Sequence, residues 1–182
     1  MGADVRLDGQ QVFAFRVAYL PLGPDGVHQL ATDADVADER GAGEATATEF
    51  AHASLTSRGA YVLIDCEGTP DVLLLATGSE VQLALQAQAE LAKAKIAVRV
   101  VSMPSTTVFD RQDLGYKLEV LPKGLPRIAI EAGVTDGWWK YGCAAVIGLD
   151  RYGESAPAGV LFKLFGFTVD NLALTVRKVL GK

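Results

Sequence analysis

Two short turns ahead of helix-forming sequence are the first candidates for chemistry in this chain. Gly78 and Ser79 follow the apolar run Val72–Ala76, and Gly153 and Ser155 precede a second apolar segment. Backbone N–H groups at a helix start, beside the carboxyl end of a strand, can bind an anion. Neither turn has the glycine-rich pattern of a nucleotide site, so an ordinary helix start, with Glu154 compensating the helix dipole at the second turn, is the interpretation that we favour.

Glu131 is the candidate for acid–base chemistry, because it comes directly after an apolar strand. It could act as a general acid or base at the edge of a sheet. The interpretation we favour is a hydrogen bond from a neighbouring loop or subunit to its carboxylate. Asp136, Trp138, Trp139 and Tyr141 follow closely, and with Glu131 they are the candidates for a subunit interface.

Nothing further in the sequence assembles into a catalytic or metal-binding set. Cys66 and Cys143 lie far apart without C-x-x-C spacing, which is typical of reduced thiols in a cytosolic protein. His28 and His52 both precede the region of regular strands, so we expect no imidazole base in the globular part. No Ser-His-Asp set or pair of carboxylates at a useful spacing can be assembled. We therefore expect no catalytic residue, no cofactor-binding residue and no metal ligand.

Composition limits the classes of partner. The chain has 182 residues, a net charge of −5 and a pI near 5.0, which disfavours binding to nucleic acid. No apolar run approaches the roughly 20 residues that cross a bilayer, and no basic region followed by an apolar core marks a signal peptide. We expect a cytoplasmic protein that binds neither nucleic acid nor membrane.

The residues that could position these candidates lie in the stretch from Asp71 to Ser102. Val72–Ala76 is apolar throughout, as in a strand buried on both faces. Ser79 and Gln82 have the spacing of a capping box, which predicts a helix with Ser79 as its N-cap. Ala97–Val101 reads as a second strand. A strand, a helix and a strand of this length predict a right-handed crossover within a parallel sheet.

The rest of the chain supplies further strands and helices. Further strands are predicted at 60–64, 127–130 and 144–148. A short helix should start with Thr106 or Thr107 as its cap and continue through Gln112, and another turn of helix should cover 116–121. The segment TDGWWKYG should form a helix with Trp138 and Trp139 packed inward. Two last helices should have Ser155 and Thr168 as their N-caps.

This order of elements predicts a three-layer α/β/α fold. We expect a mostly parallel five-stranded sheet, with the strand at Tyr61 antiparallel at one edge. Residues 57–182 should form this domain. Residues 1–56 are acidic and weakly patterned, which predicts an atypical N-terminal segment that is partly disordered or weakly folded.

Seven segments, in order from about Arg58 to Leu180, closely resemble the C-terminal domain of transketolase. They are RGAYVL, PDVLLLATGSEV, VRVVSMPS, FDRQD, VLPKG, IEAGVTDGWWKY and GESAPAGVLFKLFGFTVDN. Spacing is kept nearly throughout, so the resemblance is specific. The chain departs from the family pattern at Gly137, where an aromatic residue is common, and in the join Tyr141–Val146, which is shorter than usual.

The resemblance implies the three-layer fold and a parent activity, the transfer of a two-carbon ketol unit between sugar phosphates in the pentose phosphate pathway. That family uses thiamine diphosphate and a divalent metal such as Mg²⁺, which are held by other domains. The C-terminal domain serves mainly in assembly of the dimer. The resemblance therefore implies no cofactor bound by this chain alone, and as partners a second copy or cofactor-bearing transketolase domains.

Three hypotheses follow for function. The first, which we favour, is a non-catalytic assembly module of a transketolase-like enzyme. The second is a subunit of a split transketolase, with the cofactor-bearing domains on separate chains. The third is a small-anion-binding α/β domain that uses the helix start at Gly78 and Ser79.

Overall fold

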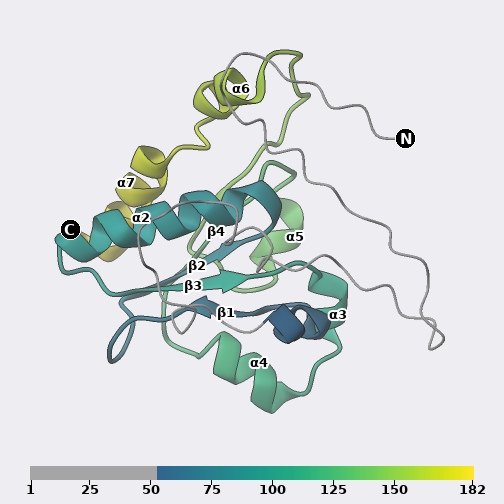
Figure 1. Ribbon diagram of the computed structural model, residues 1–182, viewed down its shortest axis with the longest axis vertical. Coiled ribbons are helices and arrows are strands. Elements are labelled where there is room, and N and C mark those ends of the chain that lie inside the picture. Colours follow the sequence, from purple (N-terminus) through teal and green to yellow (C-terminus); the bar gives the residue numbers. More distant parts are fainter. Residues whose placement is uncertain (1–52) are drawn as a thin grey trace. The chain divides into compact units, whose positions relative to one another are not determined.

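The computed structural model describes residues 53–182 (Figure 1). The expectations for His28, for His52 and for the N-terminal segment up to residue 52 lie outside the described residues. The strands are β1 (Tyr61–Ile64), β2 (Val72–Ala76), β3 (Val98–Ser102), β4 (Arg127–Ile130) and β5 (Ala145–Ile147). The helices are η1 (Ala53–Arg58), η2 (Gly78–Glu80), α2 (Val81–Lys93), α3 (Thr106–Asp110), α4 (Leu114–Val120), α5 (Asp136–Trp139), α6 (Ala158–Phe165) and α7 (Val169–Leu180).

The strands form one mixed sheet in the order β1-β3-β2-β4-β5. β1 runs antiparallel to β3 at the edge, with Tyr61 opposite Ser102, and the other neighbours are parallel. β2 lies in the centre and all five of its residues are buried. The predicted five-stranded, mostly parallel sheet with an antiparallel edge strand is therefore confirmed.

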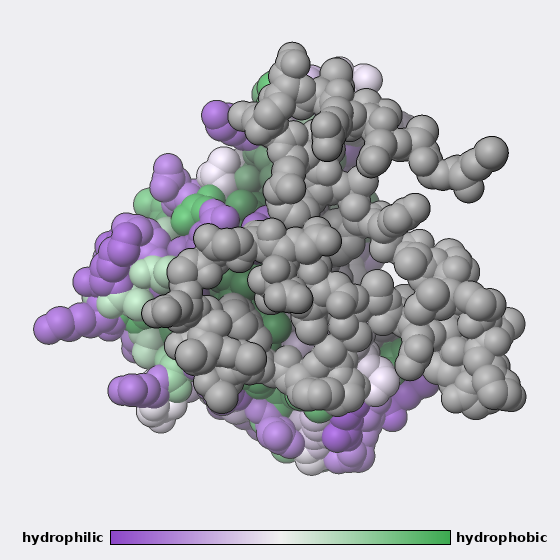
Figure 2. Space-filling model, viewed as in Figure 1, coloured by the Kyte–Doolittle hydropathy of each residue, from purple (hydrophilic) through white to green (hydrophobic). Residues whose placement is uncertain are grey.

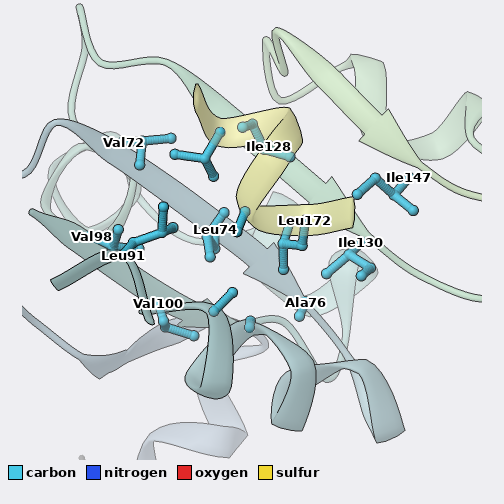
Figure 3. Close-up of a cluster of buried hydrophobic side chains, with 14 of the residues drawn as sticks. Val72, Leu74, Ala76, Leu91, Val98, Val100, Ile128, Ile130, Ile147 and Leu172 are labelled. Carbon is cyan, nitrogen blue, oxygen red and sulfur yellow. The ribbon is translucent and has the colours of Figure 1, made fainter. Parts of the chain in front are cut away.

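Helices cover both faces of this sheet, which gives three layers. Val72, Leu74 and Ala76 of β2 belong to one core, with Leu91 of α2 and Leu172 of α7 (Figure 3). The alternate β2 side chains belong to a second core with aromatic residues of α3, α4 and α5: Leu73, Leu75, Phe109, Tyr116 and Trp138. A central strand reads as a continuous apolar run because its residues alternate between these two cores. Full burial of each leucine stabilises the fold by about 1.5–3 kcal/mol.

α6 differs from the other long helices because none of its residues is buried. Figure 1 shows α6 at the top of the view, beyond the start of α7 and farther from the sheet than α2 and α7. Val160 and Leu164 are 56% and 63% exposed, and Tyr152 before the helix is 96% exposed. Hydrophobic residues reach the surface near α6 and near α2, beside hydrophilic ones (Figure 2). Among the described residues, α6 therefore packs against the first core through Phe162 and Phe165 only, and leaves Val160 and Leu164 exposed.

The 23-residue stretch Ala158–Leu180 is long and apolar enough to cross a membrane by length and composition alone. It consists of two helices, because Gly166 ends α6 in the left-handed region at a φ of 80°. Thr168 then caps α7 by accepting a hydrogen bond from the N–H of Asn171 at 3.2 Å, as predicted. α7 packs Leu172 and Val176 into the core. In this fold the stretch therefore forms two helices of the domain.

The predicted capping box at Ser79 and Gln82 is wrong. Ser79 lies inside η2, the N-cap position of α2 is Glu80, and neither η2 nor α2 has a side-chain cap. The hydroxyl of Ser79 instead donates to Glu80 Oε1 at 3.1 Å. The 3₁₀ helix η2 leads directly into α2. Ser79 therefore lies inside a helical turn and not at the N-cap position, from which a side chain can cap the helix.

Three further predictions of local structure need correction. α3 is capped by Ser105, not by Thr106 or Thr107, and it ends at Asp110. Ser155 is not an N-cap: α6 begins at Ala158, Pro157 takes the N-cap position, and no side chain caps this helix. Trp138 packs inward as predicted, but Trp139 is 49% exposed, because neighbouring residues of one helical turn face different directions.

Candidate functional site

The loops after β2 and β4 meet at the carboxyl edge of the sheet. Ala76 and Ile130 are paired at the ends of these parallel strands, so that η2 and Glu131 follow side by side. The connection from β2 leads to β3 on one side, whereas β4 lies on the other. Such a reversal of strand order is where open α/β sheets place ligands.

Glu80 is an acidic side chain buried at this edge, only 3% exposed. Its Oε1 accepts the hydrogen bond from Ser79, and burial raises the pKa of its carboxyl group. Sequence reasoning missed Glu80 as a site residue. The sequence did contain a signal for it, since an acidic residue follows the end of a strand and a Gly-Ser turn. In an open α/β sheet, such a position lies near the place where the strand order reverses.

Glu131 has the more strongly perturbed carboxyl group. Burial is the main cause and the charge of Glu80 the second, and together they raise the pKa of Glu131 to about 7. Its Oε2 atom is buried and has no hydrogen-bond partner. The backbone N–H of Glu131 donates to the carbonyl of Ile147 at 3.0 Å, which fixes the backbone against the end of β5. A carboxyl group with this pKa can donate or accept a proton near neutral pH.

The two predicted anion-binding turns lie in different surroundings. Gly78 and Ser79 are exposed beside the carboxyl groups of Glu80 and Glu131, which oppose binding of an anion whenever they are ionised. Gly153 and Ser155 lie in the exposed loop before α6. No hydrogen bond or ion pair within residues 53–182 joins the two turns. Anion binding at either turn stays a prediction.

The residues predicted for an interface divide into exposed and buried ones. Asp136 and Trp139 are exposed on α5, and Trp139 Nε1 donates to Thr135 Oγ1 at 3.3 Å. Trp138 and Tyr141 are buried, with ring centroids 6.2 Å apart, in the core under α5. Asp136 and Trp139 therefore have free surface for a contact, while Trp138 and Tyr141 position the helix.

The described residues do not fit a resident metal–diphosphate site. Between residues 53 and 182 there is no group of three or more His, Cys, Asp or Glu side chains that could hold a metal ion. Both cysteines are free, and burial raises the pKa of the Cys143 thiol to about 11. Burial, and then the charge of Asp65, raise the pKa of the Cys66 thiol. Neither thiol is therefore activated as a nucleophile or metal ligand.

Two hollows open on the surface of the described part. One, of about 280 Å³, lies beside Cys66 and Gln88. The other, of about 540 Å³, lies between α4 and the end of α5, and its lining includes Lys117, Arg127 and Lys140. Sequence reasoning missed the second hollow, because its cationic residues are spread over 24 positions of the chain and no short motif joins them.

Comparison with protein families gives one match. The family model of the transketolase-like C-terminal domain matches residues 59–168. Among curated relatives, transketolase 1 of Aliivibrio fischeri is 54% identical over 128 residues, 69% of this chain and 19% of that protein. Transketolase 1 of Escherichia coli is 50% identical over 127 residues, again 19% of its length. The chain thus spans about a fifth of the length of these relatives.

Solved structures give the same result. The transketolase of Leishmania mexicana superposes with a TM-score of 0.68 at 40% identity, over 72% of this chain and 19% of that one. A structure described as a split gene transketolase, inactive beta4 tetramer, has a TM-score of 0.50 at 23% identity, over 69% of this chain and 42% of that one. At that identity the second likeness shows the fold alone.

Proposed function

This chain belongs to the transketolase family through its C-terminal domain, and on that premise we propose that residues 57–182 act as a non-catalytic assembly domain of a transketolase-type enzyme. The observation that carries the proposal is α6, which contacts the first core through Phe162 and Phe165 while Val160 and Leu164 stay exposed. A helix of this composition is stable in water when another surface covers its apolar side. We propose that cofactor-bearing domains of the enzyme, or a second copy, provide this surface.

The enzyme reaction in this proposal is the transfer of a two-carbon ketol unit between sugar phosphates, within the pentose phosphate pathway. Thiamine diphosphate supplies the carbanion chemistry when it is bound, with a divalent metal such as Mg²⁺. The donor set of residues 53–182 does not fit these groups, so we assign no step of the reaction to them. We expect the complete enzyme in the cytoplasm, where Cys66 and Cys143 of this chain would stay reduced.

Titration calorimetry tests the non-catalytic part of the proposal. Thiamine diphosphate added with Mg²⁺ to the purified chain should give no heat of binding. Transketolase 1 of Escherichia coli, titrated under the same conditions, is the positive control. Micromolar affinity of the isolated chain for the cofactor would overturn the assembly role.

A chimera tests the assembly part. The 127 matched residues of Escherichia coli transketolase 1 would be replaced by the matching segment of this chain, which is 50% identical. We expect a dimer with ketol-transfer activity, because a domain that keeps the fold should keep the contacts. A truncated enzyme without this domain is the control, and should lose stability or activity. A chimera no better than the truncated enzyme would contradict the proposal.

A split enzyme is the alternative arrangement of the same function. Its support is limited to the fold shared with the split-gene structure. In this arrangement, separate chains with the cofactor-bearing domains should form a complex with the purified chain, and mixing should restore ketol transfer. Co-purification from cells that express the neighbouring genes distinguishes it from an enzyme whose domains are linked in one chain.

A further inference from the structure

The hollow between α4 and α5 has a positive lining in an acidic protein. The whole chain carries a net charge of −5, yet this hollow is lined by four cations and one carboxylate. The cations are Lys117, Lys123, Arg127 and Lys140, and the carboxylate is that of Asp110. We call this hollow the cationic groove. Its remaining lining residues are apolar or aromatic: Phe109, Leu118, Leu121 and Tyr141.

Asp110 neutralises only part of this charge. Its carboxylate accepts hydrogen bonds from Lys140 at 2.6 Å and from the Tyr141 hydroxyl at 2.9 Å. Lys117 donates to the main-chain carbonyl of the same residue at 2.6 Å, so that two ammonium groups are held at one residue. Burial opposes ionisation of Asp110, but the bonds from Lys140 and Tyr141 prevail and lower its pKa. The carboxylate is thus ionised and fully engaged with Lys140.

Arg127 is held firmly, but by neutral groups. Its guanidinium donates to the carbonyls of Tyr141, Leu121 and Pro122, the last two at 3.0 and 2.9 Å. Among the described residues it forms no ion pair with a carboxylate, and its Nε is buried without a hydrogen-bond partner. A guanidinium has five N–H donors, so two remain. Arg127 therefore places a fixed and uncompensated positive charge in the groove.

Two lysines add further positive charge, and the acid near Lys117 in the groove lining, Asp110, is already bonded to Lys140. Lys123 is exposed and forms neither an ion pair nor a hydrogen bond in that part of the chain. Lys117 uses one of its three N–H donors on the Asp110 carbonyl. With Arg127 these lysines bring three cations to the groove, whose single lining carboxylate, Asp110, is hydrogen-bonded to Lys140. A single carboxylate would leave two of these charges uncompensated, whereas a phosphate monoester carries nearly two negative charges and several acceptor oxygens.

We propose that the cationic groove binds a small anion that carries a phosphate group. The phosphate oxygens would accept hydrogen bonds from Lys117, Lys123 and Arg127, while the apolar and aromatic residues contact the rest of an organic ligand. The volume of about 540 Å³ is within the range of small-molecule sites, roughly 300–1,000 Å³. This site is separate from the helix start at Gly78 and Ser79, and it goes beyond the assembly function.

Titration calorimetry of the full chain at constant ionic strength tests the proposal. The probes are inorganic phosphate, glycerol 1-phosphate and uncharged glycerol. Saturable binding is expected for the two phosphates and none for glycerol. Tighter binding of glycerol 1-phosphate than of inorganic phosphate would identify an organic ligand, and equal binding would identify phosphate alone as the recognised group.

Variants locate the binding. Lys123→Gln should weaken phosphate binding about tenfold, since a charge-assisted hydrogen bond is lost, and Lys117→Gln should act similarly. Both side chains lie at the surface, so these variants should still fold. Lys163→Gln, on the exposed side of α6, removes the same charge elsewhere and should leave the affinity unchanged. No saturable binding to the wild-type chain, or equal weakening by all three substitutions, would overturn the proposal.

Discussion

At the scale of single residues, the carboxyl group of Glu131 should set a pH dependence of stability. Its pKa rises from 4.5 to about 7 on folding, mainly through burial and then through Glu80. The folded state therefore binds more protons than the unfolded state between these values. The free energy of unfolding should fall as the pH rises through this window.

Glu131→Gln removes this titration. We expect the variant to gain stability relative to the wild type between pH 5 and pH 8, by on the order of 1 kcal/mol after allowance for partial exposure. Urea unfolding at the two pH values measures it. Comparing the same pair of proteins at both values cancels any fixed packing effect of the substitution.

Glu90→Gln is the control for this measurement. Hydrogen bonding from Lys93 and the charge of the same lysine lower the pKa of Glu90, so that it titrates below this pH range. The control should leave the dependence between pH 5 and pH 8 unchanged. If Glu131→Gln also follows the wild-type curve, the carboxyl group is not held in a desolvated state and the geometry at this edge is wrong.

At the scale of elements, the helix starts predict unequal effects of losing a hydroxyl. Thr168 caps α7, so that Thr168→Ala should cost about 1 kcal/mol of stability. Ser79 caps neither η2 nor α2 and is exposed, so that Ser79→Ala should cost less than about 0.5 kcal/mol. Thermal unfolding of the two variants checks the order. Equal losses would mean that the Ser79 hydroxyl contributes as much as a cap, through its hydrogen bond to Glu80.

The turn before β1 depends on a glycine. Gly59 has a φ of +84°, and a Cβ there would lie 2.4 Å from the Phe109 main-chain nitrogen and 2.5 Å from the Ser105 carbonyl oxygen. The Gly59 carbonyl also accepts the hydrogen bond from the Ser105 N–H. Gly59→Ala should therefore destabilise the domain by about 2 kcal/mol or more, because it forces apart β1 and α3.

Gly137 supplies the matched control in α5. A Cβ at Gly137 meets nothing within 4 Å, and its backbone is helical. Gly137→Ala should leave stability unchanged or raise it by up to about 1 kcal/mol. Urea denaturation of both variants measures the contrast. A loss of stability for Gly137→Ala similar to that for Gly59→Ala would show that the effect comes from the alanine rather than from the contact.

Strands were predictable from the sequence because burial imposes a local pattern. Val72–Ala76 is apolar at every position, since the two cores take alternate side chains, and its bounds were predicted correctly. The start of a helix was predictable only where a single capping side chain determines it, as Thr168 does for α7. The prediction for Ser79 failed because the 3₁₀ turn η2 precedes α2 and moves its N-cap position from Ser79 to Glu80, and no local motif in the sequence marks such a turn.

The candidate site was predictable in part. Glu131 stood out because an acid directly after a buried strand is unusual, but its neighbour Glu80 comes from a loop 51 positions earlier in the chain. Their proximity follows from the parallel pairing of β2 with β4, which neither segment encodes by itself. The cationic groove is a similar case, since Arg127 and Lys140 belong to different elements that tertiary packing brings together.

At the scale of the whole molecule, α6 has more exposed apolar surface relative to its packing than the other α-helices of the described part, since none of its residues is buried. The fully buried residues of the two cores come from the sheet and from helices other than α6, which adds only the half-buried Phe162 and Phe165 to the first core. Relatives of the transketolase family are about five times as long as the matched segment. The exposed side of α6, with Val160 and Leu164, is the surface that we propose contacts the additional domains.

Leu164→Asp tests whether the exposed side of α6 is needed for assembly of the enzyme and not for folding of the domain. Leu164 is 63% exposed on α6, so that the substitution should change the stability of the isolated chain by less than about 0.5 kcal/mol. In the chimera with Escherichia coli transketolase 1 the same change should bury a charge, and lower the melting temperature and the dimer affinity. Leu114→Asp, at a leucine 67% exposed on α4, is the matched control and should alter neither protein. If Leu164→Asp leaves the chimera as stable and as dimeric as its parent, α6 is not the assembly surface.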